Sequence, residues 1–280
     1  MTRDAIRPCG GHRFATPVLH TVCVLATHPY LSGSHPRAFA HRGWHIDDLE
    51  GMENSMAAFR RAIDEGFRYL EIDVHATSDG VVVVHHDEEL DRTTDGHGPI
   101  ASLPWSQVGA AKIGGREGVP ALEAVLEELP SALLNIDVKA EQAVEPVLEL
   151  IRRTDAWDRV CLASFSDERL ARLRRAGGER LITSMGPKNG LVLWVSGKLG
   201  LQVGRVNGAM AQVPRKQGPL TVVDRRFLRG AHRRGIEVHV WTIDERAEMI
   251  ELLDLGVDGL VTDRPDVLRA VLRERGQWPE

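Results

Sequence analysis

The stretch Glu71-Ile72-Asp73-Val74 places two carboxylates two residues apart in a segment typical of a buried β-strand. Side chains alternate between the two faces of a strand, so Glu71 and Asp73 project from the same face. Two acids on one buried face repel each other unless a cation lies between them. Upstream, Ala40-His41-Arg42-Gly43 puts a histidine and an arginine at the end of another short strand. Together the two stretches predict a metal-assisted site for a phosphorylated substrate.

The order of predicted strands and helices favours a parallel barrel. Strand patterns occur at 37–41, 69–75, 81–85, 132–138, 160–164, 181–184, 208–213, 237–242 and 259–262, and helix patterns at 55–65, 122–128, 143–153, 167–175, 225–234, 247–255 and 265–275. The turn Ser78-Asp79-Gly80 pairs 81–85 with the strand before it as a hairpin. About eight βα units remain without it. We therefore predict an α/β fold, a TIM (β/α)8 barrel with a small insertion after the second strand.

Local signals set the boundaries of these elements. Asn54 is predicted to cap the first helix, and Pro265 to open the last one. The segment 91–118, rich in Gly, Asp and Thr, is predicted to be the insertion, and 186–204 to hold a helix or a long loop. Within the latter, the apolar run 191–201 indicates either core packing or an apolar groove.

Composition narrows the class of protein. The chain has 280 residues, 42% of them hydrophobic, and a net charge of -5, which argues against a general nucleic-acid binder. Cys9, Cys23 and Cys161 form no metal or disulfide motif and indicate free thiols in a reducing compartment. Residues 1–34 are predicted to be a loosely ordered extension, and 35–280 one domain. No apolar run is long enough to span a membrane, so we expect a cytoplasmic protein, with secretion through the apolar run 14–26 as the alternative.

Acids and cations collect at the predicted strand ends, where barrel enzymes place their active sites. Glu71, Asp73 and Asp137 suit one hard divalent cation, Ca²⁺ or Mg²⁺. Alternatively, these acids pair with Arg42 and Lys139 in a structural ion network. The same two cations also suit a phosphate group.

Two histidines are candidates for acid/base chemistry, because histidine titrates near neutral pH. His41 ends the first strand, and either His85 or His86 closes the hairpin; adjacent side chains point opposite ways, so only one of the two should face the site. Trp241 shares a face with His239 near the end of another strand, where it either packs in the core or forms a wall of the pocket.

The chain resembles the glycerophosphodiester phosphodiesterases from about Arg37 to the last predicted helix. The resemblance rests on ten blocks in order: His41-Arg42-Gly43, Glu53-Asn54-Ser55, Glu71-Ile72-Asp73-Val74, Asp79-Gly80, His86-Asp87, Asp91-Arg92-Thr93-Thr94, Pro120-Ala121-Leu122-Glu123, Asn135-Ile136-Asp137-Val138-Lys139, Val240-Trp241-Thr242 and Gly259-Leu260-Val261-Thr262-Asp263-Arg264-Pro265. It implies a TIM barrel that hydrolyses glycerophosphodiesters to sn-glycerol 3-phosphate and an alcohol with one divalent cation.

The resemblance also implies residue roles. The family's catalytic histidines correspond to His41 and His86, and its metal-binding acids to Glu71, Asp73 and Asp137. Arg42, Lys139, Glu53 and Trp241 correspond to substrate- or phosphate-binding positions. Asp137 stands where the family usually has glutamate, one methylene longer, which would loosen the metal site or favour a different ion.

Two other functions compete with this prediction. One is a lysophospholipase D-like hydrolase of lysophospholipids, which would use the apolar run 191–201 as a groove. The other is a non-catalytic barrel that binds phosphate esters, although such a protein would be expected to have lost part of the acid, histidine and cation set. The sequence predicts a small-molecule substrate and no transmembrane segment, and it leaves the alcohol and the oligomeric state open.

Overall fold

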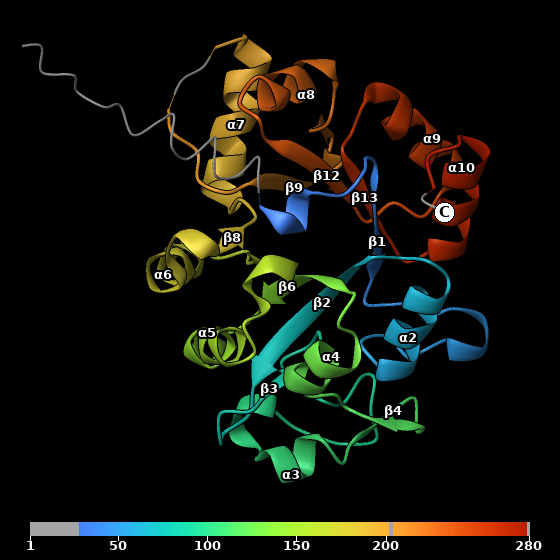
Figure 1. Cartoon of the computed structure of the whole chain (residues 1–280), viewed down its shortest axis with the longest axis vertical. Helices are drawn as coiled ribbons and strands as arrows, with labels where there is room; N and C mark the ends of the chain where they lie inside the picture. Colours follow the sequence, from blue (N-terminus) through green and yellow to red (C-terminus); the bar gives the residue numbers. More distant parts are fainter. Residues whose placement is uncertain (1–27, 202–203, 279–280) are drawn as a thin grey trace, which may run out of the picture.

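Eight parallel strands form a ring with helices around it (Figure 1). The computed structural model describes residues 28–278 except 202–203. The strands are β1 (Arg37–His41), β2 (Tyr69–Ala76), β6 (Leu133–Val138), β7 (Val160–Ala163), β8 (Ile182–Thr183), β9 (Met210–Pro214), β12 (Glu237–Trp241) and β13 (Gly259–Thr262). They lie in the order β8-β7-β6-β2-β1-β13-β12-β9, and a bridge between Ser184 and Met210 nearly closes the ring. The predicted (β/α)8 barrel is confirmed.

Helices connect the strands and cover the outside of the ring, as parallel neighbours require. They are α2 (Met56–Asp64), α4 (Leu122–Glu128), α5 (Val144–Arg153), α6 (Asp167–Gly177), α7 (Pro187–Leu199), α8 (Arg225–His232), α9 (Arg246–Leu255) and α10 (Pro265–Glu274). Prolines open α7 and α10, where a missing backbone N–H costs no helical hydrogen bond. The segment 186–204, which the sequence assigned to a helix or a long loop, therefore contains a helix.

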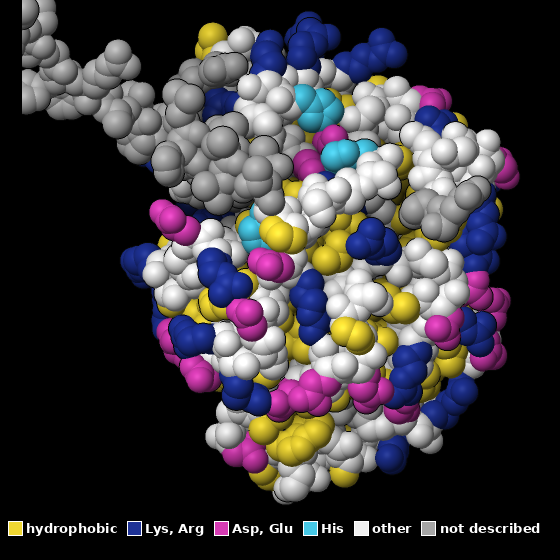
Figure 2. Space-filling model, in the orientation of Figure 1, with side chains coloured by type: hydrophobic (Ala, Val, Ile, Leu, Met, Phe, Trp, Pro, Cys, Tyr) yellow, Lys and Arg dark blue, Asp and Glu magenta, His cyan; other side chains and the backbone are white. Residues whose placement is uncertain are grey.

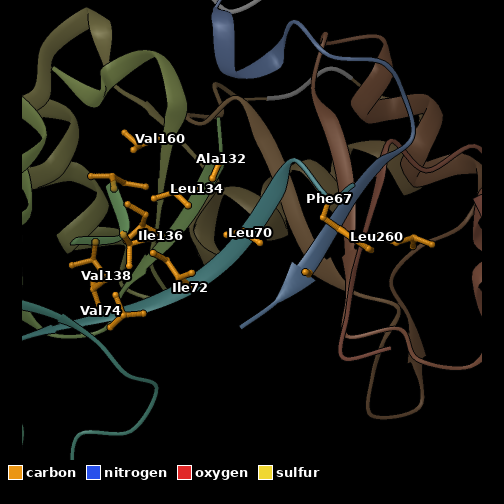
Figure 3. Packing of buried hydrophobic residues seen from close by; sticks show 14 of the residues in the cluster. Phe67, Leu70, Ile72, Val74, Ala132, Leu134, Ile136, Val138, Val160 and Leu260 are labelled. Carbon is orange, nitrogen blue, oxygen red and sulfur yellow. The ribbon is translucent and has the colours of Figure 1, made fainter. Parts of the chain in front are cut away.

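Alternation along each strand decides which side chains lie inside the ring. On β2, Tyr69 belongs to the apolar interior cluster, and Glu71 and Asp73 reach the cavity above it. The intervening residues pack with those of β6 in the apolar layer under the helices: Leu70, Ile72, Val74, Leu134, Ile136 and Val138 (Figure 3). Because the amino-terminal half of the interior is filled, the cavity opens only at the carboxyl end.

Between β2 and β6 the chain leaves the ring. β3 (Val82–Val84) pairs antiparallel with β2, and the chain then passes through η3 (Ile100–Ser102), α3 (Trp105–Val108) and the pair β4 (Lys112–Ile113) and β5 (Glu117–Gly118). This segment has an apolar cluster of its own, which includes Leu90, Ile100 and Ile113.

Two local predictions differ from the structure. Asn54 does not cap α2; the Ser55 hydroxyl accepts from the Ala58 N–H, and Asn54 takes a left-handed φ of 58° that turns its side chain toward the site. Part of the predicted extension is packed rather than loose: His28 and Tyr30 are buried, and Tyr30 meets Tyr69 edge-on at 5.3 Å between ring centroids.

The rest of the predicted extension, residues 1–27 with Cys9 and Cys23, lies outside the described residues, whereas Cys161 is a buried free thiol. No helix within the described residues is both long and apolar enough to cross a membrane.

Candidate active site

A cavity of about 650 Å³ opens at the carboxyl end of the barrel, where the predicted site residues meet. One side is charged and polar, and its residues come from β1, β2, β6 and the β3 hairpin: His41, Arg42, Glu71, Asp73, His86, Asn135, Asp137 and Lys139. The opposite side is largely apolar and comes from α7, β9, β11 (Leu220–Thr221) and the end of β12. The cavity therefore combines a charged, polar side with a largely apolar wall.

The three predicted acids are brought together by the register of two neighbouring strands. β2 pairs with β6 so that Asp73 lies directly beside Asp137, and Glu71 lies one pleat below. The Lys139 ammonium is 2.8 Å from a carboxylate oxygen of each aspartate. Burial of the Lys139 ammonium would by itself lower its pKa. The charges of Asp73 and Asp137 outweigh burial and raise the pKa of Lys139.

Negative charge is poorly compensated at Glu71. Burial, and then the charge of Asp73, raises the pKa of Glu71 well above its ordinary value. Five of the nine buried side-chain atoms that lack a hydrogen-bond partner among the described residues surround this cluster: Arg42 Nε, Asn54 Oδ1, Glu71 Oε2, Asn135 Oδ1 and Asp137 Oδ1. Buried polar groups are normally paired, and four of these five atoms are acceptor oxygens, so the cluster has more acceptors than its donors satisfy.

The donor set fits a hard divalent cation. Glu71 Oε2 and Asp137 Oδ1 are buried carboxylate oxygens without partners, the type of ligand that Mg²⁺ and Ca²⁺ prefer. In the described part of the chain, no group of three or more acid, histidine or cysteine side chains is already arranged around one point as a ligand set. Instead, Lys139 bridges Asp73 and Asp137. This contact agrees with the alternative prediction, in which the acids pair with cationic side chains in an ion network.

His41 is oriented by an acid from the last strand. Its Nδ1 is 2.6 Å from Asp263 Oδ1, which leaves Nε2 directed toward Glu71 Oε2 at 3.6 Å. His45 Nε2 also lies 3.1 Å from Asp263. Burial alone would lower the pKa of His41, but the hydrogen bond with Asp263 and the charge of Glu71 outweigh it and raise the pKa. A proton on His41 is therefore stabilised.

His86 has a separate orienting acid on the hairpin. Its Nδ1 is 2.6 Å from Asp87 Oδ1, and the second oxygen of Asp87 accepts from Arg92 Nε at 2.5 Å. The hydrogen bond from Arg92, followed by that from His86, lowers the pKa of Asp87. His85 points away, and its ring bonds Thr93 and the Asp87 carbonyl. The prediction that only one of the adjacent histidines faces the cavity is confirmed.

Arg42 lies between two acids. Its Nη1 donates to Glu53 at 2.9 Å, and its Nε is 3.4 Å from Asp73. Glu53 also accepts from Arg92 and does not line the cavity. Glu53 therefore supports Arg42 from behind, and its role in binding substrate stays a prediction. Because Arg92 bonds both Glu53 and Asp87, Glu53 connects Arg42 with the acid that orients His86.

The apolar wall includes two residues that the sequence left ambiguous. Trp241 lines the cavity and meets Phe165 edge-on, with ring centroids 5.8 Å apart. Leu191 and Trp194 of α7 line it as well. Trp241 is therefore a wall of the pocket, and the core-packing interpretation of the run 191–201 is wrong for Leu191, which is 61% exposed.

Sequence reasoning missed two supporting residues. Asn54 donates to Asp73 at 3.0 Å, and Asp263 binds His41. Asp263 follows the end of a strand and lay inside a quoted motif, so strand-end position was a usable signal. Asn54 also belongs to one of the motifs, but it does not follow a strand, and its role depends on a left-handed backbone that turns it toward β2.

Paired histidines, clustered carboxylates and two cations at the carboxyl end of a (β/α)8 barrel define the class of barrel enzymes that act on phosphate esters. The sequence model of the "Glycerophosphoryl diester phosphodiesterase family" matches residues 31–267. The chain belongs to this family, and the prediction that it is a phosphodiesterase enzyme is confirmed.

Individual relatives agree with this assignment. A probable glycerophosphodiester phosphodiesterase 2 of Mycobacterium tuberculosis is 40% identical over 246 residues, covering 86% of this chain and 92% of the relative. A human protein named as a lysophospholipase D is 26% identical over 259 residues, covering 80% and 82%. The crystal structure of a putative glycerophosphoryl diester phosphodiesterase from Silicibacter pomeroyi has the same fold, with a TM-score of 0.74 and 22% identity over 91% of this chain and 99% of that chain.

Proposed function

We propose that this enzyme hydrolyses glycerophosphodiesters to sn-glycerol 3-phosphate and an alcohol by two-histidine acid/base catalysis. The observation that carries the proposal is the pair of histidines, His41 and His86, each oriented through Nδ1 by its own aspartate beside one cluster of acids and cations. Both rings then present Nε2 to a phosphate bound in the polar part of the cavity. Arg42 and Lys139 supply positive charge at the same place.

The proton steps follow from this placement. One histidine removes the proton from the attacking oxygen, either water or the neighbouring glycerol hydroxyl. The other histidine donates a proton to the departing alcohol oxygen as its bond to phosphorus breaks. Because Asp263 and Asp87 remain ionised, each stabilises the protonated form of its histidine. Asn135 and Arg42 are placed to orient the phosphate.

Glu71, Asp73 and Asp137 would hold one divalent cation, Ca²⁺ or Mg²⁺. When bound, such an ion supplies positive charge that stabilises the phosphate as negative charge develops on its oxygens. The support is the set of unpaired carboxylate oxygens at Glu71 and Asp137. Lys139 would then keep contact with the outer carboxylate oxygens or contact the phosphate.

The test is release of glycerol 3-phosphate from glycerophosphocholine by the purified enzyme, first with EDTA and then with calcium or magnesium restored. We expect release that EDTA abolishes and a divalent cation restores. Release that is unaffected by EDTA would contradict the metal proposal alone. No release by folded enzyme with either metal would contradict the substrate class.

A lysophospholipase D-like activity is a second candidate, because one observation favours it. Leu191, Trp194 and Leu220 give the cavity an apolar side large enough to contact an acyl chain. Turnover of lysophosphatidylcholine relative to glycerophosphocholine separates the two candidates. We also propose a cytoplasmic location, which cell fractionation would test.

A further inference from the structure

The exposed apolar side chains of this protein are concentrated in one sector. Among the described residues, the large apolar side chains with at least 38% exposure all lie beside the cavity mouth or on the helix that forms its apolar wall. Four are on α7 (Leu191, Val192, Val195 and Leu199), Leu201 follows that helix, and Phe165 and Leu220 stand on the cavity rim. Such a concentration on a soluble surface indicates an interaction site.

The outward face of α7 is not required for packing the barrel. Leu191, Val195 and Leu199 are four residues apart and share one face of the helix, at 61%, 40% and 66% exposure. The opposite face packs on α8, where Gly197 and Gly230 allow the two backbones to approach closely. A helix that needed only one apolar face to pack therefore carries a second one toward solvent.

The same part of the chain is strongly basic. Residues 186–236 contain ten Lys and Arg but a single acid, Asp224, which gives a net charge of +9 in a chain whose total is -5. Arg225, Arg226 and Arg229 are exposed on α8, and Arg233 is exposed directly after it. Within the described residues, no side-chain ion pair neutralises these four arginines. Lys and Arg side chains gather along the edge of the molecule where α8 lies (Figures 1 and 2).

We propose that the α7–α8 sector, meaning α7, α8 and the β10–β11 hairpin (Lys216–Gln217 and Leu220–Thr221), docks onto a lipid bilayer with anionic headgroups. Exposed apolar side chains enter the interfacial layer, and nearby Lys and Arg contact the headgroups. Leu191 and Leu220 belong both to this sector and to the cavity wall, so docking sets the cavity mouth at the level of the headgroups.

Charge distinguishes a bilayer from other occupants. A second copy of the chain bound through this sector would bring another excess of positive charge against the first, and like charges across an interface are unfavourable. A nucleic acid would satisfy the arginines but would leave the apolar face of α7 exposed. An anionic bilayer is complementary to both features. Docking onto the bilayer does not depend on the proposed reaction. The idea that docking gives the enzyme access to a lipid-derived phosphodiester does rest on the proposed function.

Co-sedimentation of the full chain with vesicles tests the proposal. We expect binding to phosphatidylcholine vesicles that contain 30% phosphatidylglycerol, and about tenfold weaker binding to pure phosphatidylcholine. Val195→Gln/Leu199→Gln changes two residues that do not line the cavity and keeps helix propensity. Arg229→Gln/Arg233→Gln removes two charges. Each pair should lower the partition coefficient about tenfold or more.

Arg60→Gln/Arg61→Gln on α2 is the control for charge, because it also removes two positive charges and the helix lies away from this sector (Figure 1). There the two arginines pair with Glu128 and Asp48. This variant should bind vesicles like the parent chain. Hydrolysis of soluble glycerophosphocholine is measured in parallel and should be unchanged in both sector variants, so a failure of the proposed function is distinguishable from a failure of docking. The proposal is overturned if the parent chain does not bind phosphatidylglycerol vesicles at low salt, or if both sector variants bind like the parent. It is also overturned if the chain forms a dimer that only Val195→Gln/Leu199→Gln disrupts.

Discussion

Arg37 and His41 stand at opposite ends of one strand, β1, and both face the interior of the barrel. At the amino end, every nitrogen of the Arg37 guanidinium has an acceptor: two bonds of 2.7 Å reach Glu237, and others reach the Tyr69 hydroxyl and backbone carbonyls. At the carboxyl end, His41 faces Glu71, whose Oε2 accepts no hydrogen bond. The charged group at the amino end is therefore fully compensated, whereas the carboxylate that His41 faces at the carboxyl end is not.

The difference separates structural charge from functional charge. A buried ion pair with all its donors satisfied closes the amino end of the barrel and holds η1 (Pro29–Leu31) against it through the Leu31 carbonyl. Buried carboxylates without donors carry an energetic cost that a ligand can relieve. Charged groups are buried at both ends of the barrel, so burial does not distinguish them. The two ends differ in whether the buried charged atoms have hydrogen-bond partners.

The largest expected effect is on catalysis at the carboxyl end. His41→Ala and His86→Ala should each lower kcat for glycerophosphocholine by about 10²–10⁴ and leave the thermal unfolding midpoint nearly unchanged. His97→Ala, at an 82% exposed side chain between β3 and η3, is the matched control and should keep parental turnover. Near-parental kcat in both site variants would rule out the two-histidine assignment.

The next effect concerns stability at the amino end. Arg37→Met leaves the Glu237 carboxylate buried without its main partner and should lower the free energy of unfolding by about 3–5 kcal/mol. The double variant Arg37→Met/Glu237→Gln removes the charge from both partners and should recover part of the loss. Urea unfolding measures all three proteins. A loss below about 1 kcal/mol in the single variant would mean that this pair does not hold the amino end together.

A smaller effect is expected from the acids that orient the histidines. Asp263→Asn and Asp87→Asn should each lower kcat about 10- to 100-fold, because a neutral amide no longer stabilises a protonated histidine. In Asp263→Asn, the limb of the pH–rate profile that His41 sets should also shift to lower pH, because burial lowers the pKa of His41 and the hydrogen bond that opposes burial is lost. Asp91→Asn, whose partner is the exposed His97, serves as the control. An unchanged pH profile in Asp263→Asn, together with parental kcat in Asp87→Asn, would leave both acids with a structural role only.

The smallest effect is a difference in how the two ends respond to pH. The bond with Arg37 lowers the pKa of Glu237 against the opposing effect of burial, so its stabilisation is present above its ordinary pKa near 4.5 and is lost as the pH falls below that value. Burial and Asp73 raise the pKa of Glu71, so Glu71 weakens the metal-free fold as the pH rises above about 4.5.

Thermal unfolding in EDTA checks both signs. Glu237→Gln should be less stable than the parent at pH 7, with the difference shrinking toward pH 3. In EDTA, Glu71→Gln should gain stability relative to the parent as the pH rises from 5 to 8. In a separate experiment without EDTA, a saturating divalent cation should stabilise only the parent. The same sign of pH response in both variants would contradict the contrast between the two ends.

Local patterns accounted for much of the fold and of the site. The alternation of Glu71 with Ile72 and Asp73, repeated around Asn135 and Asp137, was enough to predict which side chains face the cavity, because the period of a strand is local. The boundaries of α4 and β13 coincide with those predicted. Capping of α2 was assigned to the wrong residue, since Asn54 and Ser55 are both good caps and only the turn of the backbone chooses between them.

The sequence by itself determined a parallel barrel with its acids, histidines and cations at one end. Tertiary structure decided what each group touches. Closing the ring brings β13 beside β1, so that Asp263 reaches His41 across 222 residues of chain, and β6 beside β2, so that Lys139 bridges Asp73 and Asp137. It also decided that the apolar face of α7 points outward. Such pairings depend on which elements become neighbours, and no local period in the sequence encodes that choice.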